Sequence, residues 1–123
     1  MIRATLQMQV FVCVQPTDMR RSFNGLSGMV RQVLAQDPLS GALFLFRNRS
    51  RDRLKILYWD RNGLWVCAKR LERGTFFWPE ARESSVEMTA AELALILGGI
   101  DLRATRKRRW YERPALGSVT TAG

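Results

Sequence analysis

Arginine occupies every second position along a short stretch near the middle of the chain. The alternating residues are Arg47, Arg49, Arg51 and Arg53, and Asp52 is the only acid among them. In an extended strand, every second side chain points to the same side, about 6.7 Å apart. Guanidinium groups at that spacing suit hydrogen bonds to DNA phosphates or to base edges in a groove. The stretch therefore predicts a DNA contact, and a solvated turn is the alternative interpretation.

Two further basic clusters extend this predicted contact. Near the C-terminus, four consecutive cations precede Trp110-Tyr111, which suits neutralisation of phosphates and stacking on bases. An equal alternative is a tail whose rings pack back on the domain. The other cluster is residues 69–74, at the end of an expected strand. Strand alternation directs the side chains of Lys69 and Arg70 to opposite faces. An ion pair with Glu72 would give at least one of the cations a structural role. The predicted DNA-contacting residues are Arg47, Arg49, Arg51, Arg53, Lys55, Lys69, Arg70, Arg73, Arg106, Lys107, Arg108 and Arg109.

The chain as a whole carries a large excess of positive charge. Its 20 Lys and Arg against 11 Asp and Glu give a formal net charge of +9. A domain this basic is attracted to polyanions, of which nucleic acid is the commonest and an anionic membrane surface is the alternative. Arginine supplies most of the charge, which favours nucleic acid, although GC-rich coding would also raise the arginine content.

Enzymatic chemistry finds little support in the residue types. The chain has no histidine, which excludes Ser-His-Asp and Cys-His catalysis. Cys13 and Cys67 are too few for a four-ligand zinc site and lie in apolar runs typical of buried, reduced thiols. Asp18, Asp60 and Asp101 suit a helix start, a turn and a helix end better than a metal pair. We therefore expect no enzymatic activity, no cofactor and no metal.

The elements that position the basic residues begin with a strand and a long helix. Residues 8–14 are rich in Val and Phe, and Pro16 closes the expected strand. Thr17 or Asp18 can then cap a helix that runs to about Gln36, because apolar residues recur every three or four positions. The opposite side of this helix would be basic.

The middle of the chain predicts an antiparallel meander, and a shorter helix follows it. The strands of the meander would be Ala42–Arg47, Leu54–Asp60 and Leu64–Leu71. Asn62-Gly63 is a strong hairpin signal, and the polar residues 80–87 are expected to form a loop. Thr89 begins a capping box with Glu92, and Gly98-Gly99 ends the helix that follows.

These elements together predict a single small α+β domain. It would be an antiparallel β-meander packed against a long N-terminal helix and a shorter C-terminal helix, with residues 1–102 in the domain and 103–123 in a basic, flexible tail. The start of the chain lacks the shape of a signal peptide, and no apolar stretch reaches the roughly 20 residues of a membrane span. Trp59, Trp65 and Trp78 suit core or cross-strand positions better than a ligand cage.

Seven motifs occur in an order that is more specific than any one of them. They are residues 16–26, Asp37-Pro38-Leu39-Ser40-Gly41, 43–49, 51–60, 69–74, Phe77-Trp78-Pro79 and Gly99-Ile100-Asp101-Leu102. Together they resemble the TnpB accessory proteins of bacterial insertion sequences in the family numbered 66. Ser22, Asn24 and Arg61 depart from the family's pattern; Arg61 stands where the family's turn often has glycine.

The resemblance implies participation in DNA transposition beside a separate, larger transposase of the same element. We expect a non-catalytic accessory protein that binds DNA, at the ends of the insertion sequence, through the arginine-rich hairpin and the basic tail. The alternative is an adaptor that binds the transposase without direct DNA contact, through a sheet edge or the tryptophan-bearing face. The expected location is the bacterial cytoplasm, at the nucleoid when DNA is bound, without a membrane partner. The oligomeric state and the DNA sequence preference stay open.

Overall fold

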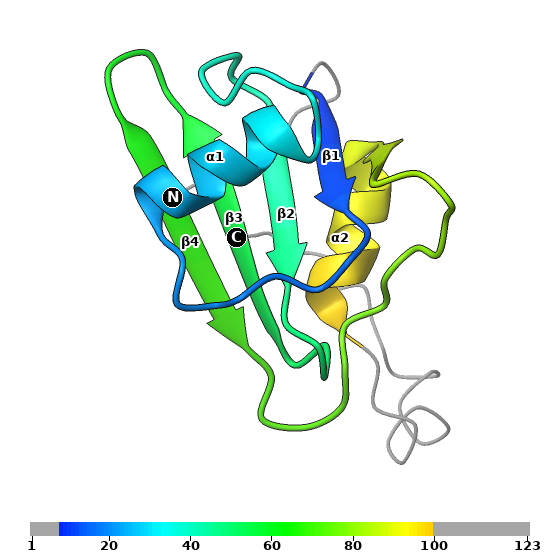
Figure 1. Ribbon diagram of the computed structural model, residues 1–123. Coiled ribbons are helices and arrows are strands. Elements are labelled where there is room, and N and C mark those ends of the chain that lie inside the picture. The colour runs from blue at the N-terminus through cyan, green and yellow to red at the C-terminus, as the bar shows by residue number, and fades with distance from the viewer. Residues whose placement is uncertain (1–7, 100–123) are drawn as a thin grey trace.

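The computed structural model describes residues 8–99, in which a five-stranded mixed sheet has one helix on each face (Figure 1). The strand order is β4-β3-β2-β1-β5. β1 runs parallel to β2, and the other neighbouring strands are antiparallel. The elements in chain order are β1 (Val10–Cys13), α1 (Phe23–Gln32), β2 (Leu43–Arg47), β3 (Arg53–Trp59), β4 (Leu64–Arg70), β5 (Ser85–Met88) and α2 (Ala90–Gly98).

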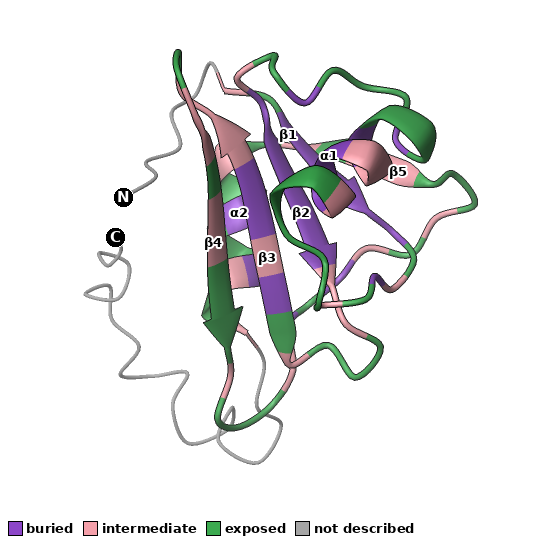
Figure 2. Ribbon diagram, turned by 60° about the vertical axis from the view of Figure 1, so that its left-hand side comes forward, coloured by how far each residue is buried: buried purple, intermediate pink, exposed green. Residues whose placement is uncertain are grey.

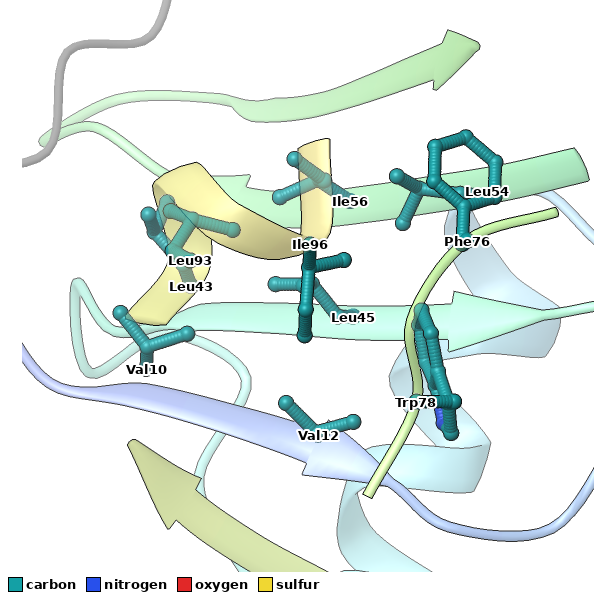
Figure 3. Close-up of a cluster of buried hydrophobic side chains, with 10 residues drawn as sticks. All are labelled: Val10, Val12, Leu43, Leu45, Leu54, Ile56, Phe76, Trp78, Leu93 and Ile96. Carbon is teal, nitrogen blue, oxygen red and sulfur yellow. The ribbon is translucent and has the colours of Figure 1, made fainter. Parts of the chain in front are cut away.

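Alternate residues of the central strands face opposite helices and so form two core layers. Val12 of β1 and Leu45 of β2 pack with Ile96 of α2 in one layer (Figure 3). Phe44 of β2 lies in the other layer with Leu26 of α1. All five side chains are completely buried, and burial of side chains of this size stabilises a fold by roughly 1.5–3 kcal/mol each. The expected α+β class is therefore confirmed.

The segment after β4 completes the layer beneath α2. Phe76 and Trp78 cover the part of the sheet that the helix does not reach (Figure 3). Trp78 is 4% exposed, and its indole N–H donates a hydrogen bond of 2.9 Å to the backbone carbonyl of Cys13. The core position expected for this tryptophan is confirmed. Trp65 of β4 occupies the other expected kind of position, a cross-strand one opposite Tyr58 of β3, and 47% of its surface is exposed.

The N-terminal helix is shorter than the sequence predicts. Thr17 is buried, and its amide donates to a backbone carbonyl at the end of β2. The Asp18 carboxylate accepts hydrogen bonds from the amide and the guanidinium of Arg20 in a turn. Because both predicted caps are used in this way, α1 begins only after Ser22. It ends early because Ala35 adopts a φ of 55°, which no helix can continue through.

The sheet is larger and more mixed than the predicted meander. The three segments expected in the middle of the chain do form β2, β3 and β4, paired antiparallel. The prediction of a loop at residues 80–87 was wrong for residues 85–87, because residues 85–88 form β5. Glu87 of this strand lies opposite Phe11 of β1, and Met88 packs against the layer beneath α2. Alternation of polar and apolar residues over only four positions was too short a signal to identify this edge strand.

The hairpin between β3 and β4 forms at the expected place, but the residue with the left-handed backbone conformation is not one of the expected pair, Asn62-Gly63. The amide of Asp60 donates to the carbonyl of Gly63, which closes the turn. The positive φ, 74°, belongs to Arg61 rather than to Asn62 or Gly63. Glycine adopts such a conformation without steric cost, which explains why the family's turn suits glycine at the position that Arg61 occupies here.

The capping box at the start of α2 yields a first prediction. The Thr89 hydroxyl accepts the amide of Glu92, and the Glu92 carboxylate accepts the amide of Thr89. Replacing Thr89 by alanine is expected to lower the free energy of unfolding by about 1 kcal/mol. Thr89 is exposed, so the change leaves no cavity. Urea denaturation followed by circular dichroism measures the effect, and Thr89→Ser should restore it; equal stability of the alanine and serine variants would contradict the cap.

Candidate nucleic-acid interface

The connection between β2 and β3 is a turn organised by Asn48. Its side-chain oxygen accepts the amides of Asp52, at 3.1 Å, and Arg53, at 3.0 Å. Its amide nitrogen donates to the Asp52 carboxylate at 2.7 Å, and this bond holds the pKa of Asp52 below its usual value. Arg51 adopts a φ of 60° in the same turn. The alternation of an extended strand is therefore interrupted, and the four arginines do not form one row as expected.

Arg47 belongs to the fold more than to the surface. Its guanidinium donates to the carbonyl of Val14 at 2.8 Å, which joins the end of β2 to the chain after β1. The Arg47 Nε is buried with no hydrogen-bond partner in the described part of the chain. This burial, with the charge of Arg51 nearby, lowers the pKa of the Arg47 guanidinium. We therefore place the candidate contact on the exposed arginines beside it.

Arg53 and Arg70 lie directly opposite each other across β3 and β4. Both are exposed. Strand alternation places them on the same face as Leu57 and Val66, which pack in the layer beneath α1, and α1 covers that face of the sheet in part (Figure 2). Like charges directly opposite each other across two strands are destabilising. Arg70 also forms an ion pair of 3.2 Å with Glu72, but both partners are well exposed and such pairs contribute little. The fold gains little from this arrangement, which we call the Arg53–Arg70 pair.

Arg53 lies between two shallow depressions in the protein surface and lines both of them. The first, of about 400 Å³, is lined in part by Thr17, Asn48 and Arg49. The second, of about 480 Å³, is lined in part by Lys55 and by both members of the Arg53–Arg70 pair. Arginine can hold an anion in two places at once through its planar fork. Each hollow also has one acid in its lining, Asp18 in the first and Glu72 in the second, and each acid is paired with an arginine. Adjoining hollows bordered by three arginines thus suit successive phosphate groups of a nucleic-acid backbone.

The two predicted lysines hold backbone carbonyls on opposite faces of the sheet. The Lys55 ammonium donates to the carbonyl of Arg21 at 2.8 Å, just before α1. The Lys69 ammonium donates to the carbonyl of Leu97 at 2.7 Å, in the last turn of α2. A cation there also interacts favourably with the dipole of the helix. Lys69 therefore faces away from Arg70, as strand alternation predicted.

The remaining predicted contacts are exposed or lie outside residues 8–99. Arg49 and Arg51 are exposed in the turn that Asn48 organises, and Arg73 is exposed in the segment after β4. The predicted contacts of the basic tail are outside the described residues: Arg106, Lys107, Arg108 and Arg109. The boundary expected between residues 102 and 103 is outside them as well.

Two of the acids considered for a metal pair, Asp18 and Asp60, have other partners, and Asp101 lies outside the described residues. Asp18 forms an ion pair of 2.7 Å with Arg20, whose hydrogen bonds hold the Asp18 pKa well below its usual value. Asp60 accepts the indole N–H of Trp65 at 2.7 Å. Within residues 8–99, no three His, Cys, Asp or Glu side chains gather where they could hold a metal ion. The helices in the same range are too short or too polar to span a membrane.

Comparison with known proteins agrees with the resemblance found in the motifs. A family model described as IS66 Orf2 like protein matches residues 8–107. An uncharacterized protein of Sinorhizobium fredii, y4jC, is 36% identical over 93% of this chain and 97% of its own length. A second from the same organism, y4hO, is 39% identical over 84% of this chain and 90% of its own length. No solved structure matches the chain. From the family match and these two relatives, we conclude that the chain belongs to the IS66 Orf2-like family of transposition-associated accessory proteins.

Proposed function

We propose that this protein is a non-catalytic accessory factor of transposition that binds DNA through the Arg53–Arg70 pair. The observation that carries the proposal is the in-register placement of two exposed arginines across neighbouring strands. The arrangement is unfavourable in the free protein and becomes favourable when an anion lies between the two guanidinium groups. Membership of a family associated with an insertion sequence supports the choice of that element's DNA as the polyanion.

Neighbouring cations would extend the contact along one strand of the duplex. Arg49 borders the first depression, and Arg53 borders both. Phosphate contacts of this kind fix the position of a protein on DNA and carry no sequence information themselves. The proposed surface therefore supplies affinity, and Arg106 to Arg109 of the basic tail would add further non-specific attraction.

Binding to a duplex that carries an end of the insertion sequence tests the proposal. Fluorescence anisotropy with the full-length protein at low salt is expected to show saturable binding. The affinity should fall steeply as salt is added, because each phosphate contact releases counterions. Absence of binding at the lowest salt concentration would refute the proposal.

A second candidate role, as an adaptor for the transposase, is favoured by a different observation. Leu95 of α2 has 71% of its surface exposed, and its neighbours Ala91 and Ala94 are exposed too. An apolar helix surface of this kind suits a protein partner better than DNA. Co-purification of the transposase from nuclease-treated extract separates the roles: a complex that survives supports the adaptor, and one that is lost supports contact through DNA.

A further inference from the structure

The outer edge of β4 is an unpaired strand edge in the described part of the chain. β4 ends the sheet, with β3 as its neighbouring strand (Figure 2). The amide of Leu71 donates to the carbonyl of Asp52, so the odd-numbered residues of β4 bond to β3. Val66, Ala68 and Arg70 consequently direct their backbone N–H and C=O groups away from the sheet. A strand of seven residues with such an edge can accept another strand.

We infer that β4 pairs antiparallel with β4 of a second copy of this chain, centred on Cys67. This register overlaps all seven residues of the strand. The outward-directed residues then meet as hydrogen-bonded pairs: Val66 opposite Ala68, and Leu64 opposite Arg70. Trp65 lies opposite Lys69, and Cys67 lies opposite Cys67 of the second copy.

The distribution of charge along β4 disfavours two other arrangements, and the Cys67-centred register is the one that overlaps the whole strand. Its two cations, Lys69 and Arg70, are adjacent at the C-terminal end of the strand. An in-register parallel pair would place Lys69 beside Lys69 and Arg70 beside Arg70 of the second copy. An antiparallel pair centred on Lys69 would place the two Lys69 ammonium groups opposite each other. Like charges directly opposite are destabilising. Centring on Cys67 removes both clashes, because every cation then lies opposite an apolar or aromatic residue.

Exposed Trp65 supplies a favourable contact in the same register. The residue is 47% exposed, and a hydrogen bond of 2.7 Å from its indole N–H to the Asp60 carboxylate fixes the orientation of the ring. In the pair, the Lys69 side chain of the second copy would lie against this ring. The Lys69 ammonium donates to the Leu97 carbonyl of its own chain, so the aliphatic stem of the lysine supplies this contact, and the symmetric pair forms it twice.

Oxidation of the purified, DNA-free protein tests the inference directly. Opposite residues in a non-hydrogen-bonded antiparallel pair have Cα atoms about 4.5 Å apart, within the range that a disulfide spans. Mild oxidation with diamide is expected to link two chains through Cys67, in wild type and in Cys13→Ser but not in Cys67→Ser. Under reducing conditions, sedimentation should show a mass that rises from one chain towards two with concentration. A wild-type chain that stays monomeric and gives no crosslink would refute the pairing.

Two variants test the register and the edge separately. In Cys67→Ser/Lys69→Cys, the new thiols would lie about 13 Å apart along the paired strands, so no crosslink is expected. Ala68→Pro removes an outward N–H that makes no bond to β3, and it should weaken the association at least about tenfold while the far-ultraviolet spectrum is unchanged. Crosslinking of Cys67→Ser/Lys69→Cys to the same extent as wild type would overturn the register, whether or not the proline variant folds. These experiments contain no DNA, so their failure leaves the proposed function untouched.

Discussion

Replacing Trp78 by alanine is expected to lower the free energy of unfolding by about 3–5 kcal/mol. The side chain is 4% exposed and packs with Phe76 over the part of the sheet beyond α2. Its loss leaves a cavity and also removes the donor of the 2.9 Å hydrogen bond to the Cys13 carbonyl. Since small domains have total stabilities of about 5–15 kcal/mol, the effect would be a large fraction of the whole.

Two neighbouring substitutions separate the contributions to this effect. Trp78→Phe keeps most of the buried ring but leaves the Cys13 carbonyl without its donor, so a smaller loss of about 1–3 kcal/mol is expected. Phe77→Ala is the matched control, because Phe77 is 51% exposed beside two buried aromatic residues; its cost should be below about 1 kcal/mol. Urea denaturation followed by circular dichroism gives all three values. A cost for Phe77→Ala equal to that for Trp78→Ala would contradict the described packing.

Replacing both members of the Arg53–Arg70 pair by glutamine is expected to weaken DNA binding about 60-fold at roughly 0.1 M salt. This value assumes that each arginine contacts one phosphate. Loss of each contact reduces the slope of the logarithm of the binding constant against the logarithm of salt concentration by about 0.9. Stability should be unchanged or slightly higher, because the substitutions remove two like charges that face each other across the sheet. A loss of binding without a loss of stability distinguishes a functional surface from a structural one.

A second double variant controls for the change in net charge. Arg31→Gln/Arg82→Gln also removes two exposed arginines, at the end of α1 and before β5 respectively. Since neither residue lines the two depressions beside Arg53, the control should retain most of the affinity. Competition anisotropy with one labelled duplex compares both variants with wild type. Equal weakening by the two variants would show that bulk charge, rather than the Arg53–Arg70 pair, determines binding.

The sequence predicted most elements that have a strong local signal. The capping box of α2 formed as expected because Thr89 and Glu92 are close in the chain and need only each other. The three central strands formed because their alternation and turn residues agree. The predicted caps of the first helix failed because Thr17 is held by a strand that lies far along the chain. Such tertiary contacts override local propensity and cannot be read from a short window.

The sequence indicated which arginines belong to the candidate site but not how they are arranged in space. The arginine-rich stretch was recognised, yet Asn48 bends it into a turn through hydrogen bonds that alternation alone does not reveal. The Arg53–Arg70 pair was missed, although a signal existed. Trp59 lies opposite Leu64 next to the hairpin turn. Moving the same number of residues away from the turn along both strands leads to Arg53 on β3 and Arg70 on β4, which are therefore opposite each other. Applying that register required knowing that the turn spans Asp60 to Gly63.

The salt dependence of binding tests the central claim most directly, because it counts phosphate contacts. The logarithm of the binding constant is measured against the logarithm of salt concentration, for wild type and for R53Q/R70Q, on the same insertion-sequence duplex. If the Arg53–Arg70 pair contacts two phosphates, the slope of the variant will be smaller in magnitude by about 1.8. Identical slopes for the two proteins would contradict the account.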